Sequence, residues 1–123
     1  MQRLLKTLGV SFDLHAKELP GKPDAVIRSL RSAIFVHGCY WHKHRCRYGR
    51  VRAQTNATFW DEKRAANVAR DRRDRRRLRA LGWRAITIWE CWIRVDIKKV
   101  EQRITEFLGE AEGRKLIISH RLR

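Results

Sequence analysis

The sequence has 123 residues, which suits a single domain because independent folding units usually contain about 100 to 150 residues. A charged fraction of 34% and the lack of a long apolar run exclude a membrane-spanning helix. With 29 Lys and Arg against 13 Asp and Glu, the formal net charge is +16, which is typical of proteins that bind nucleic acid. The first residues lack the apolar stretch of a secretory signal, so we expect a cytoplasmic protein. We expect it to form one domain spanning residues 1–123 and to be a monomer.

The first elements are predicted to be short. Leucines at helical spacing precede Gly9, a suitable C-cap, so the chain is expected to open with a helix that ends there. A short strand is expected over Val10 to Leu14. The segment from Leu19 to Asp24, which contains two prolines and a glycine, predicts a turn into a second strand, Ala25 to Ile27.

The middle of the chain predicts a buried strand and a long basic helix. The apolar run from Ala33 to Val36 is typical of a buried strand, and it ends at His37. A polar, histidine-rich loop follows. The pattern then becomes helical from Asp61 to Leu81, with Thr58 as the expected N-cap and Gly82 as the end.

The last third predicts one more strand and one more helix. The branched and aromatic residues from Trp83 to Trp89 suit the centre of a sheet, and Cys91 lies just beyond them. An apolar stripe from Ile97 to Leu108 predicts a helix with Asp96 as N-cap and Gly109 as its end. Residues 110–123 carry no clear pattern. Strands and helices mixed in this order predict an α/β domain with a small mixed sheet flanked by helices.

The three cysteines favour a metal site, because in a cytosolic chain an odd number of thiols is poorly explained by disulfides. Cys39, His44, Cys46 and Cys91 would supply the four ligands of tetrahedral zinc and leave no cysteine over. His42 could replace His44, since spacing alone does not choose between them. A closed site of this kind would be structural. The alternative is three unrelated thiols and solvent-exposed histidines, because this spacing is not that of a standard zinc finger.

Asp24, His37 and His42 offer the groups that magnesium-dependent phosphodiester hydrolysis requires. A carboxylate holds the ion, a base activates water, and further groups balance charge at the phosphate. Each residue also has a structural alternative, because an aspartate after proline often serves a turn and a histidine ending a strand often has a structural role.

Longer motifs sharpen this hypothesis. The segments are Leu19-Pro-Gly-Lys-Pro-Asp24, Phe35-Val-His-Gly-Cys-Tyr-Trp-His-Lys-His-Arg-Cys46, Asn67-Val-Ala-Arg-Asp-Arg-Arg-Asp74, Leu81-Gly-Trp-Arg84 and Ile88-Trp-Glu-Cys91. In this order, between about Phe12 and Cys91, the chain resembles the very short patch repair (Vsr) endonucleases. The resemblance implies a restriction-endonuclease-like core, a structural zinc, and magnesium-dependent nicking of double-stranded DNA 5′ to the T of a T:G mismatch. It also implies a nucleoid-associated enzyme, with mismatch-repair proteins as candidate partners.

The resemblance also assigns the site residues. Asp24 is similar to the metal-binding aspartate, His37 and His42 to the two active-site histidines, and the four Cys and His residues named above to the zinc ligands. In restriction-like nucleases a second metal position lies on the following strand, where Val36 can offer only its backbone carbonyl. His42 is then the expected base, because an imidazole exchanges protons near neutral pH. Asp71 is our candidate to orient His42, with an ordinary helix salt bridge as the alternative.

Aromatic and polar residues would read the mismatch. The resemblance makes Tyr40, Trp41 and Trp60 wedges that push into the base stack, although each could instead belong to the core. Lys63 and Asn67 share a helix face with Asp71 and could touch the mismatched bases, or they could form a solvated stripe. The arginines between residues 70 and 77 surround the helix, so only some of them can face phosphate.

The chain departs from the family pattern before Gly9. Family members carry an acidic residue on an N-terminal helix, a little over ten residues before the equivalent glycine, so we expect a truncated first helix that lacks it. The competing hypothesis is a zinc-stabilised module that binds DNA or mismatches without cutting. Convergence of Asp24, His37 and His42 on one point would favour the enzyme.

Overall fold

The computed structural model describes residues 2–47, 49–50 and 55–121. Its elements, in chain order, are α1 (Gln2–Thr7), β1 (Asp13–Leu14), β2 (Ala25–Ile27), the 3-10 turn η1 (Arg28–Leu30), β3 (Ser32–His37), α2 (Ala57–Ala80), β4 (Arg84–Trp89), α3 (Glu90–Val95) and α4 (Ile97–Arg121). The strands form one mixed sheet in the order β1-β2-β3-β4. β1, β2 and β3 are antiparallel neighbours, whereas β3 and β4 are parallel. Among the described residues, no helix is long and apolar enough to cross a membrane.

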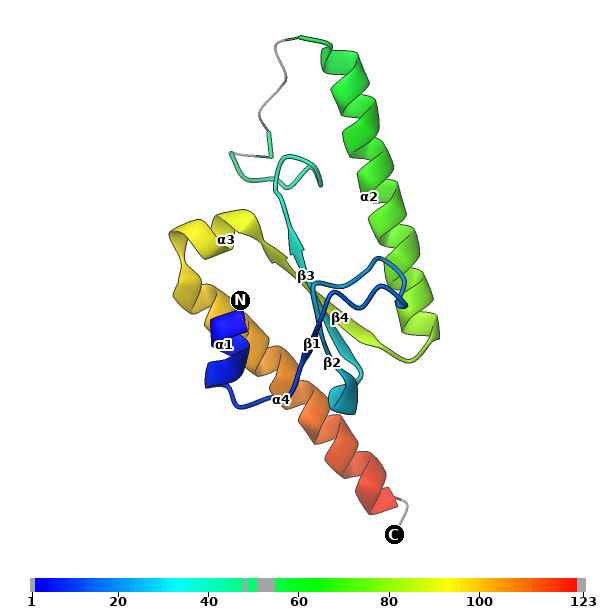
Figure 1. The fold of residues 1–123 in the computed structure, drawn as a ribbon, viewed down its shortest axis with the longest axis vertical. Coiled ribbons are helices and arrows are strands. Elements are labelled where there is room, and N and C mark those ends of the chain that lie inside the picture. The colour runs from blue at the N-terminus through cyan, green and yellow to red at the C-terminus, as the bar shows by residue number, and fades with distance from the viewer. Residues whose placement is uncertain (1, 48, 51–54, 122–123) are drawn as a thin grey trace.

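Helices cover both faces of the sheet, because successive side chains of a strand point to opposite faces. On one face, Ile34 and Ile88 pack with Leu5 of α1 and with Val100 and Ile104 of α4. On the other face, a second cluster joins strand residues to the C-terminal half of α2; its buried members are Ala16, Val26, Ala33, Phe35 and Leu78. The sheet therefore lies between α2 on one side and α1 with α4 on the other (Figure 1). This confirms the predicted small mixed sheet flanked by helices.

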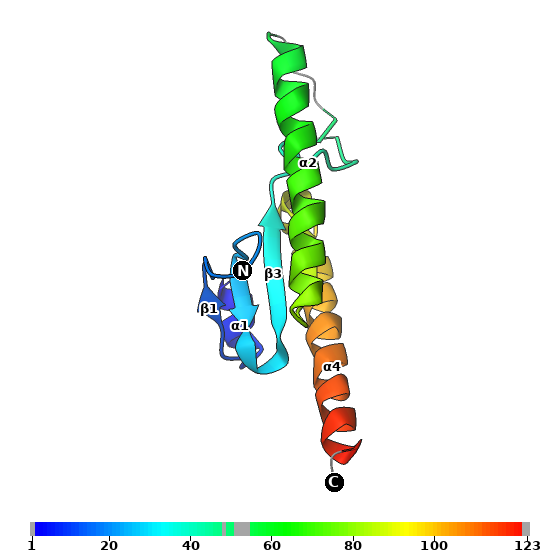
Figure 2. The ribbon, with the colours of Figure 1, turned by 90° about the vertical axis from the view of Figure 1, so that its right-hand side faces the viewer.

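The molecule is elongated along α2 and α4. Figure 2 shows both long helices running close to the vertical axis, with the short strands beside them. The N-terminal half of α2 extends beyond the sheet, where it lies next to the loop that follows β3 (Figure 1). That end of the molecule carries most of the residues predicted to have a function.

Several predicted boundaries agree with the structure. The first helix ends before Gly9, whose φ of +71° is the left-handed conformation that glycine favours. β2 has the predicted bounds, and β3 ends at His37. The backbone N–H of Lys99 donates to the Asp96 carboxylate at 3.2 Å, so Asp96 is the N-cap of α4.

Other boundaries were predicted wrongly. The first strand is limited to Asp13–Leu14 instead of starting at Val10. α2 begins at Ala57 with Asn56 at the N-cap position, so Thr58 is not the cap. α4 continues past Gly109 and Gly113 to Arg121, because each glycine inside a helix costs only about 1 kcal/mol.

β4 lies at the edge of the described sheet and not at its centre. Its branched and aromatic residues are explained by the helices that pack on it, and such composition does not reveal the position of a strand in the sheet. Cys91 is the second residue of α3, a helix that the sequence did not predict.

Candidate active site and metal centre

The site is organised by the C-terminal end of β3. Because β2 and β3 are antiparallel, Asp24, just before β2, lies beside the end of β3. The backbone N–H of Val36 donates to Oδ2 of Asp24 at 2.6 Å, and the carbonyl of Asp24 accepts from the N–H of His15 at 3.0 Å. Both the backbone and the carboxylate of Asp24 are therefore held in place.

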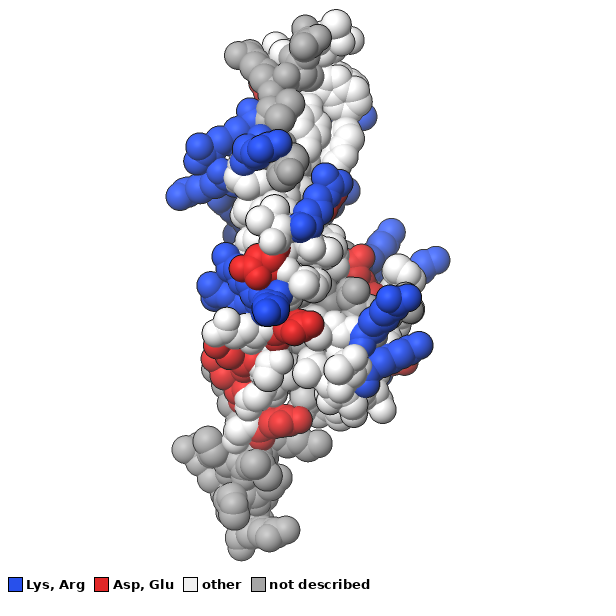
Figure 3. Space-filling view, turned by 90° about the vertical axis from the view of Figure 1, so that its left-hand side faces the viewer, with Lys and Arg blue, Asp and Glu red and all other residues white. Residues whose placement is uncertain are grey.

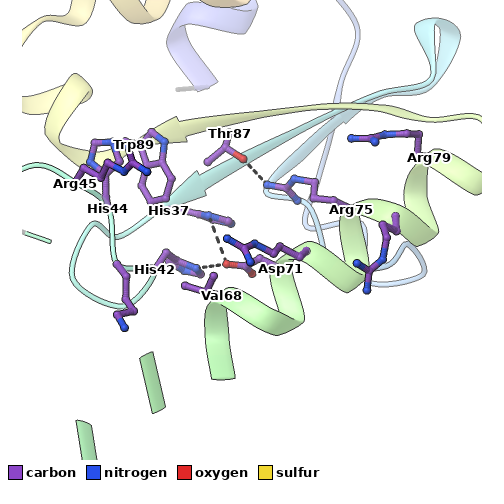
Figure 4. A pocket seen from close by; sticks show the side chains of 13 residues that line it. His37, His42, His44, Arg45, Val68, Asp71, Arg75, Arg79, Thr87 and Trp89 are labelled. Carbon is purple, nitrogen blue, oxygen red and sulfur yellow. Dashed lines mark hydrogen bonds and ion pairs between the residues drawn. The ribbon is translucent and has the colours of Figure 1, made fainter. Parts of the chain in front are cut away.

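Two histidines lie face to face at this strand end. The rings of His37 and His42 stack with 3.8 Å between their centroids and an angle of 9°. Asp71 approaches from α2: its Oδ2 is hydrogen-bonded to Nδ1 of His42 and lies 3.9 Å from Nδ1 of His37. Figure 4 shows the three side chains pointing toward one another. One ligand atom from each of these three residues lies within 4.8 Å of the other two, so strand, loop and helix converge here.

His37 is a neutral imidazole in this setting. Its exposed fraction is 8%, and burial lowers its pKa to about 4 because the charged form is poorly solvated. A positive charge on His42 would lower the pKa of His37 further, and the attraction of Asp71 only partly opposes the shift. His37 therefore carries one ring N–H and one lone pair near neutral pH.

Two clefts meet at the histidine pair. Both have His37, His42 and Asp71 in their walls. The cleft on the β2 side, about 580 Å³ in volume, is also lined by Asp24 and Val36. The cleft on the β4 side is about 830 Å³ and is bordered by α2 and β4. Asp24, His37 and His42 thus line one cavity.

A second cluster joins the loop after β3 to α3. Its members are Cys39, His44, Cys46 and Cys91, whose ligand atoms all lie within 4.8 Å of one another. Sγ of Cys91 is 3.6 Å from Nδ1 of His44, and the N–H of Cys91 donates to Sγ of Cys39 at 3.4 Å. The ring of His44 stacks on Trp89 with centroids 4.1 Å apart. His44 therefore belongs to the cluster, whereas His42 points to Asp71.

The chemistry of this donor set fits a soft metal ion. Burial raises the pKa of Cys39 to about 12 and also raises that of Cys91, so without a cation these thiols keep their protons. A bound metal ion reverses that balance, because it stabilises thiolate directly. Three sulfurs and one imidazole are a donor set of the kind that structural zinc uses.

The predicted wedge residues gather where the N-terminal half of α2 lies beside the loop after β3. Tyr40 and Trp41 meet edge to face at 5.3 Å between ring centroids, and Trp41 meets Trp60 in the same way at 5.5 Å. Trp41 has an exposed fraction of 43%. It is therefore a surface residue, and the core alternative is wrong for it.

Phe59 joins this group, although the sequence analysis missed it. It is 49% exposed and meets Trp60 edge to face at 5.1 Å. Its position next to Trp60 at the predicted start of a helix could have indicated it. We call Tyr40, Trp41, Phe59 and Trp60 the aromatic cluster.

Lys63 and Asn67 both lie against this cluster. Nζ of Lys63 sits 4.8 Å from the ring centroid of Phe59 and 5.7 Å from that of Trp60. Nδ2 of Asn67 donates to the carbonyl of Trp41 at 3.2 Å. The two side chains thus share a helix face with Asp71 as predicted, and Asn67 also holds the loop against α2.

Arg64 is the main structural residue that sequence reasoning missed. It is only 5% exposed, and its Nε donates to the carbonyl of Tyr40 at 2.6 Å while its guanidinium covers the Tyr40 ring at 4.3 Å. A second hydrogen bond reaches the carbonyl of Gly49. In the sequence, only its spacing from Asn67 and Asp71 on one helix face could have indicated a buried role for Arg64. That signal is weak, because arginine is usually exposed.

Charge is unevenly distributed over the surface. On the face in Figure 3, basic side chains lie at the upper end, where the loop after β3 lies, and along the right side, whereas most acidic side chains lie from the middle to the lower left. The cleft on the β4 side is also rich in arginine. The net charge of +16 is therefore concentrated in part around the candidate site.

Comparisons with known proteins agree with this geometry. A family model described as DNA mismatch endonuclease Vsr matches residues 1–48. The DNA mismatch endonuclease Vsr of Escherichia coli (strain K12) is 46% identical over 107 residues, which cover 87% of this chain and 68% of that protein. The type II nicking enzyme V.XorIIP of Xanthomonas oryzae pv. oryzae is 42% identical over 108 residues, covering 88% of this chain and 78% of the relative. With this identity over most of both chains, the protein belongs to the Vsr family of DNA endonucleases.

Proposed function

We propose that this endonuclease nicks one strand of double-stranded DNA on the 5′ side of the T in a T:G mismatch, by magnesium-dependent hydrolysis on a restriction-endonuclease-like core. The observation that carries the proposal is the hydrogen-bonded pair of His42 and Asp71, which faces the same cleft as Asp24. The Escherichia coli relative is named a DNA mismatch endonuclease, and two further relatives are named type II nicking enzymes.

In this proposal His42 is the general base. Its Nδ1 is engaged by Asp71, so Nδ1 carries the proton and Nε2 keeps a lone pair that can accept a proton from water. Asp71 is a positioning residue that fixes the tautomer and the ring orientation. His37 stacks on His42 and, being neutral, can hold a phosphate oxygen through its ring N–H.

Asp24 and the backbone carbonyl of Val36 would hold magnesium. In a strand, the N–H and C=O of one residue point to the same side, so the Val36 carbonyl shares the side on which its N–H contacts Asp24. Bound magnesium would polarise the phosphate and lower the pKa of a bound water. Few protein ligands suffice, because magnesium usually keeps several waters.

We infer that the four-residue Cys and His cluster binds structural zinc. It joins the loop that carries His42, Tyr40 and Trp41 to the helix after β4. Loss of the metal would therefore affect both the base and the aromatic residues, although neither is a metal ligand.

Tyr40, Trp41 and Trp60 would enter the base stack at the mismatch, and Lys63 and Asn67 would contact the mismatched bases. Exposed aromatic rings beside a basic side chain support this role. A T:G wobble pair is less costly to distort than a matched pair, which favours a wedge mechanism.

A single-turnover assay tests the proposal. Duplexes with one T:G or one T:A pair, end-labelled on either strand, are incubated with enzyme and magnesium, and products are mapped on a sequencing gel. We expect one nick, 5′ to the T of the mismatched duplex, which Asp24→Asn and His42→Ala abolish. Preference for T:G duplex without any nick would instead support the non-catalytic binding module.

A further inference from the structure

The cleft on the β4 side of the histidine pair is strongly cationic (Figure 4). Its basic lining residues are Lys43, Arg45, Arg72, Arg75, Arg76 and Arg79. The carboxylate in its wall belongs to Asp71, which is already hydrogen-bonded to His42. A concave surface with this excess of positive charge attracts anions more strongly than isolated surface charges do.

α2 separates its arginines between surfaces. Arg72, Arg75, Arg76 and Arg79 follow the i, i+3, i+4, i+7 spacing of one helix face, and all four line the cleft on the β4 side. Arg70 and Arg77 line the cleft that contains Asp24. Arg73 belongs to neither cleft and lies 3.9 Å from Asp74. The helix therefore presents an ordered row of guanidinium groups that begins at the histidine pair.

Arg75 is the fixed member of this row. Its guanidinium lies 3.4 Å from the ring centroid of Phe35, and its Nη2 donates to the hydroxyl of Thr87. Its Nη1 is buried and has no hydrogen-bond partner among the described residues. Burial lowers its pKa to about 10, so it stays charged at neutral pH. A fixed, charged donor of this kind suits a phosphate oxygen.

We propose that this cleft is a second phosphate-binding subsite, which holds backbone phosphate neighbouring the scissile one on the DNA strand that crosses His37 and His42. The histidine pair forms part of both clefts, so a strand over it reaches the Asp24 cleft in one direction and the arginine row in the other. The proposal rests on the proposed function for the identity of the strand. The row would keep the strand aligned while the neighbouring phosphate is hydrolysed.

Two paired variants test the subsite. Arg76→Gln with Arg79→Gln removes two exposed charges from the cleft, and Arg73→Gln with Lys98→Gln removes two exposed charges outside it. Affinity for matched and mismatched duplexes is measured by fluorescence anisotropy without magnesium, over a salt series. We expect the cleft variant to reduce the slope of log affinity against log salt by about 0.9 for each phosphate that the protein no longer neutralises. The control pair should change the slope by less than half as much.

Single methylphosphonate substitutions then locate the phosphate that the cleft binds. In the wild type, a neutral linkage at one or two positions beside the nick should weaken binding severalfold. In the cleft variant the same substitutions should weaken binding no further. We call this loss of effect coupling, and Arg75→Lys should show it at the same positions. Equal slopes for both paired variants, or no coupled position, would overturn the subsite even if the protein nicks. Coupling in a protein that never nicks would sustain the subsite and reject the proposed function.

Discussion

Nδ1 of His42 is hydrogen-bonded to Oδ2 of Asp71, although the two residues are 29 positions apart in the sequence. One belongs to the loop after β3 and the other to the middle of α2. Such a bond determines which ring nitrogen is protonated and which remains free to accept a proton. It fixes the orientation and tautomer of the His42 ring through a residue of α2, so the sequence of the loop alone does not predict them.

Replacing Asp71 by Asn should slow nicking about a hundredfold, because the amide can present an N–H to Nδ1 and stabilise the wrong tautomer of His42. Duplex affinity should stay within about twofold, since no charge on the DNA-facing arginines is removed. Glu62→Gln, an exposed acidic position on the same helix, is the matched control. A wild-type single-turnover rate for Asp71→Asn would mean that Asp71 is an ordinary helix residue.

Asp24→Asn should abolish magnesium-dependent nicking while leaving DNA affinity similar or slightly higher. The neutral amide loses the ion, yet it also removes a negative charge from a phosphate-facing cleft. Rates are measured at saturating enzyme, and affinity is measured in calcium. Asp13→Asn, which removes an exposed carboxylate paired with Arg28, controls for charge. If Asp24→Asn cuts at the wild-type rate, Asp24 is not a metal ligand.

From the sequence, the residues of the site could be predicted more fully than the contacts around them. Motifs identified Asp24 and the histidines because their residue types are required by the chemistry. The choice between His42 and His44 as zinc ligand depended on the path of the loop, which spacing does not specify. The structure places His44 with the cysteines and His42 with Asp71.

Hydrophobic patterns could not predict how α2 is held. Two of its buried residues, Arg64 and Asp74, are charged, so the apolar periodicity that normally indicates a packed face is nearly absent. The fourth strand shows the same limit, because its composition predicts burial but not its neighbours in the sheet. Polar contacts between distant segments become visible only once the chain is folded.

The metal cluster predicts a difference between two neighbouring histidines. His44→Ala should lose bound zinc and lower the melting temperature, whereas His42→Ala should keep one zinc per chain and lose only nicking. Structural zinc can contribute on the order of 10 kcal/mol to folding, so the effect of His44→Ala should be large. Elemental analysis and thermal melts of the purified variants give both readouts. Equal zinc content in the two variants would contradict this ligand set.

Zinc affinity should rise with pH. Burial raises the pKa values of Cys39 and Cys91 in the metal-free fold, so protons compete with the metal and are released when it binds. The metal-bound state is therefore favoured as pH increases and lost as pH falls. Competition with a chromophoric chelator across pH 6 to about 8 measures this, together with proton release in weak buffer. A pH-independent affinity would show that thiolates are not the ligands.

The aromatic cluster supplies the last prediction. Trp41→Ala and Phe59→Ala should each reduce the preference for T:G over T:A duplex, because both rings are exposed and base stacking is worth about 1 to 3 kcal/mol per ring. Stability should change little, since neither side chain is buried, whereas replacing a core aromatic residue by Ala would lower the melting temperature strongly. Leu81→Ala, at an exposed apolar position outside both clefts, is the control. Preference is measured as the ratio of dissociation constants in calcium. If Phe59→Ala leaves that ratio unchanged while Trp41→Ala lowers it, the surface that reads the mismatch ends at Trp60, and Phe59 only supports its ring.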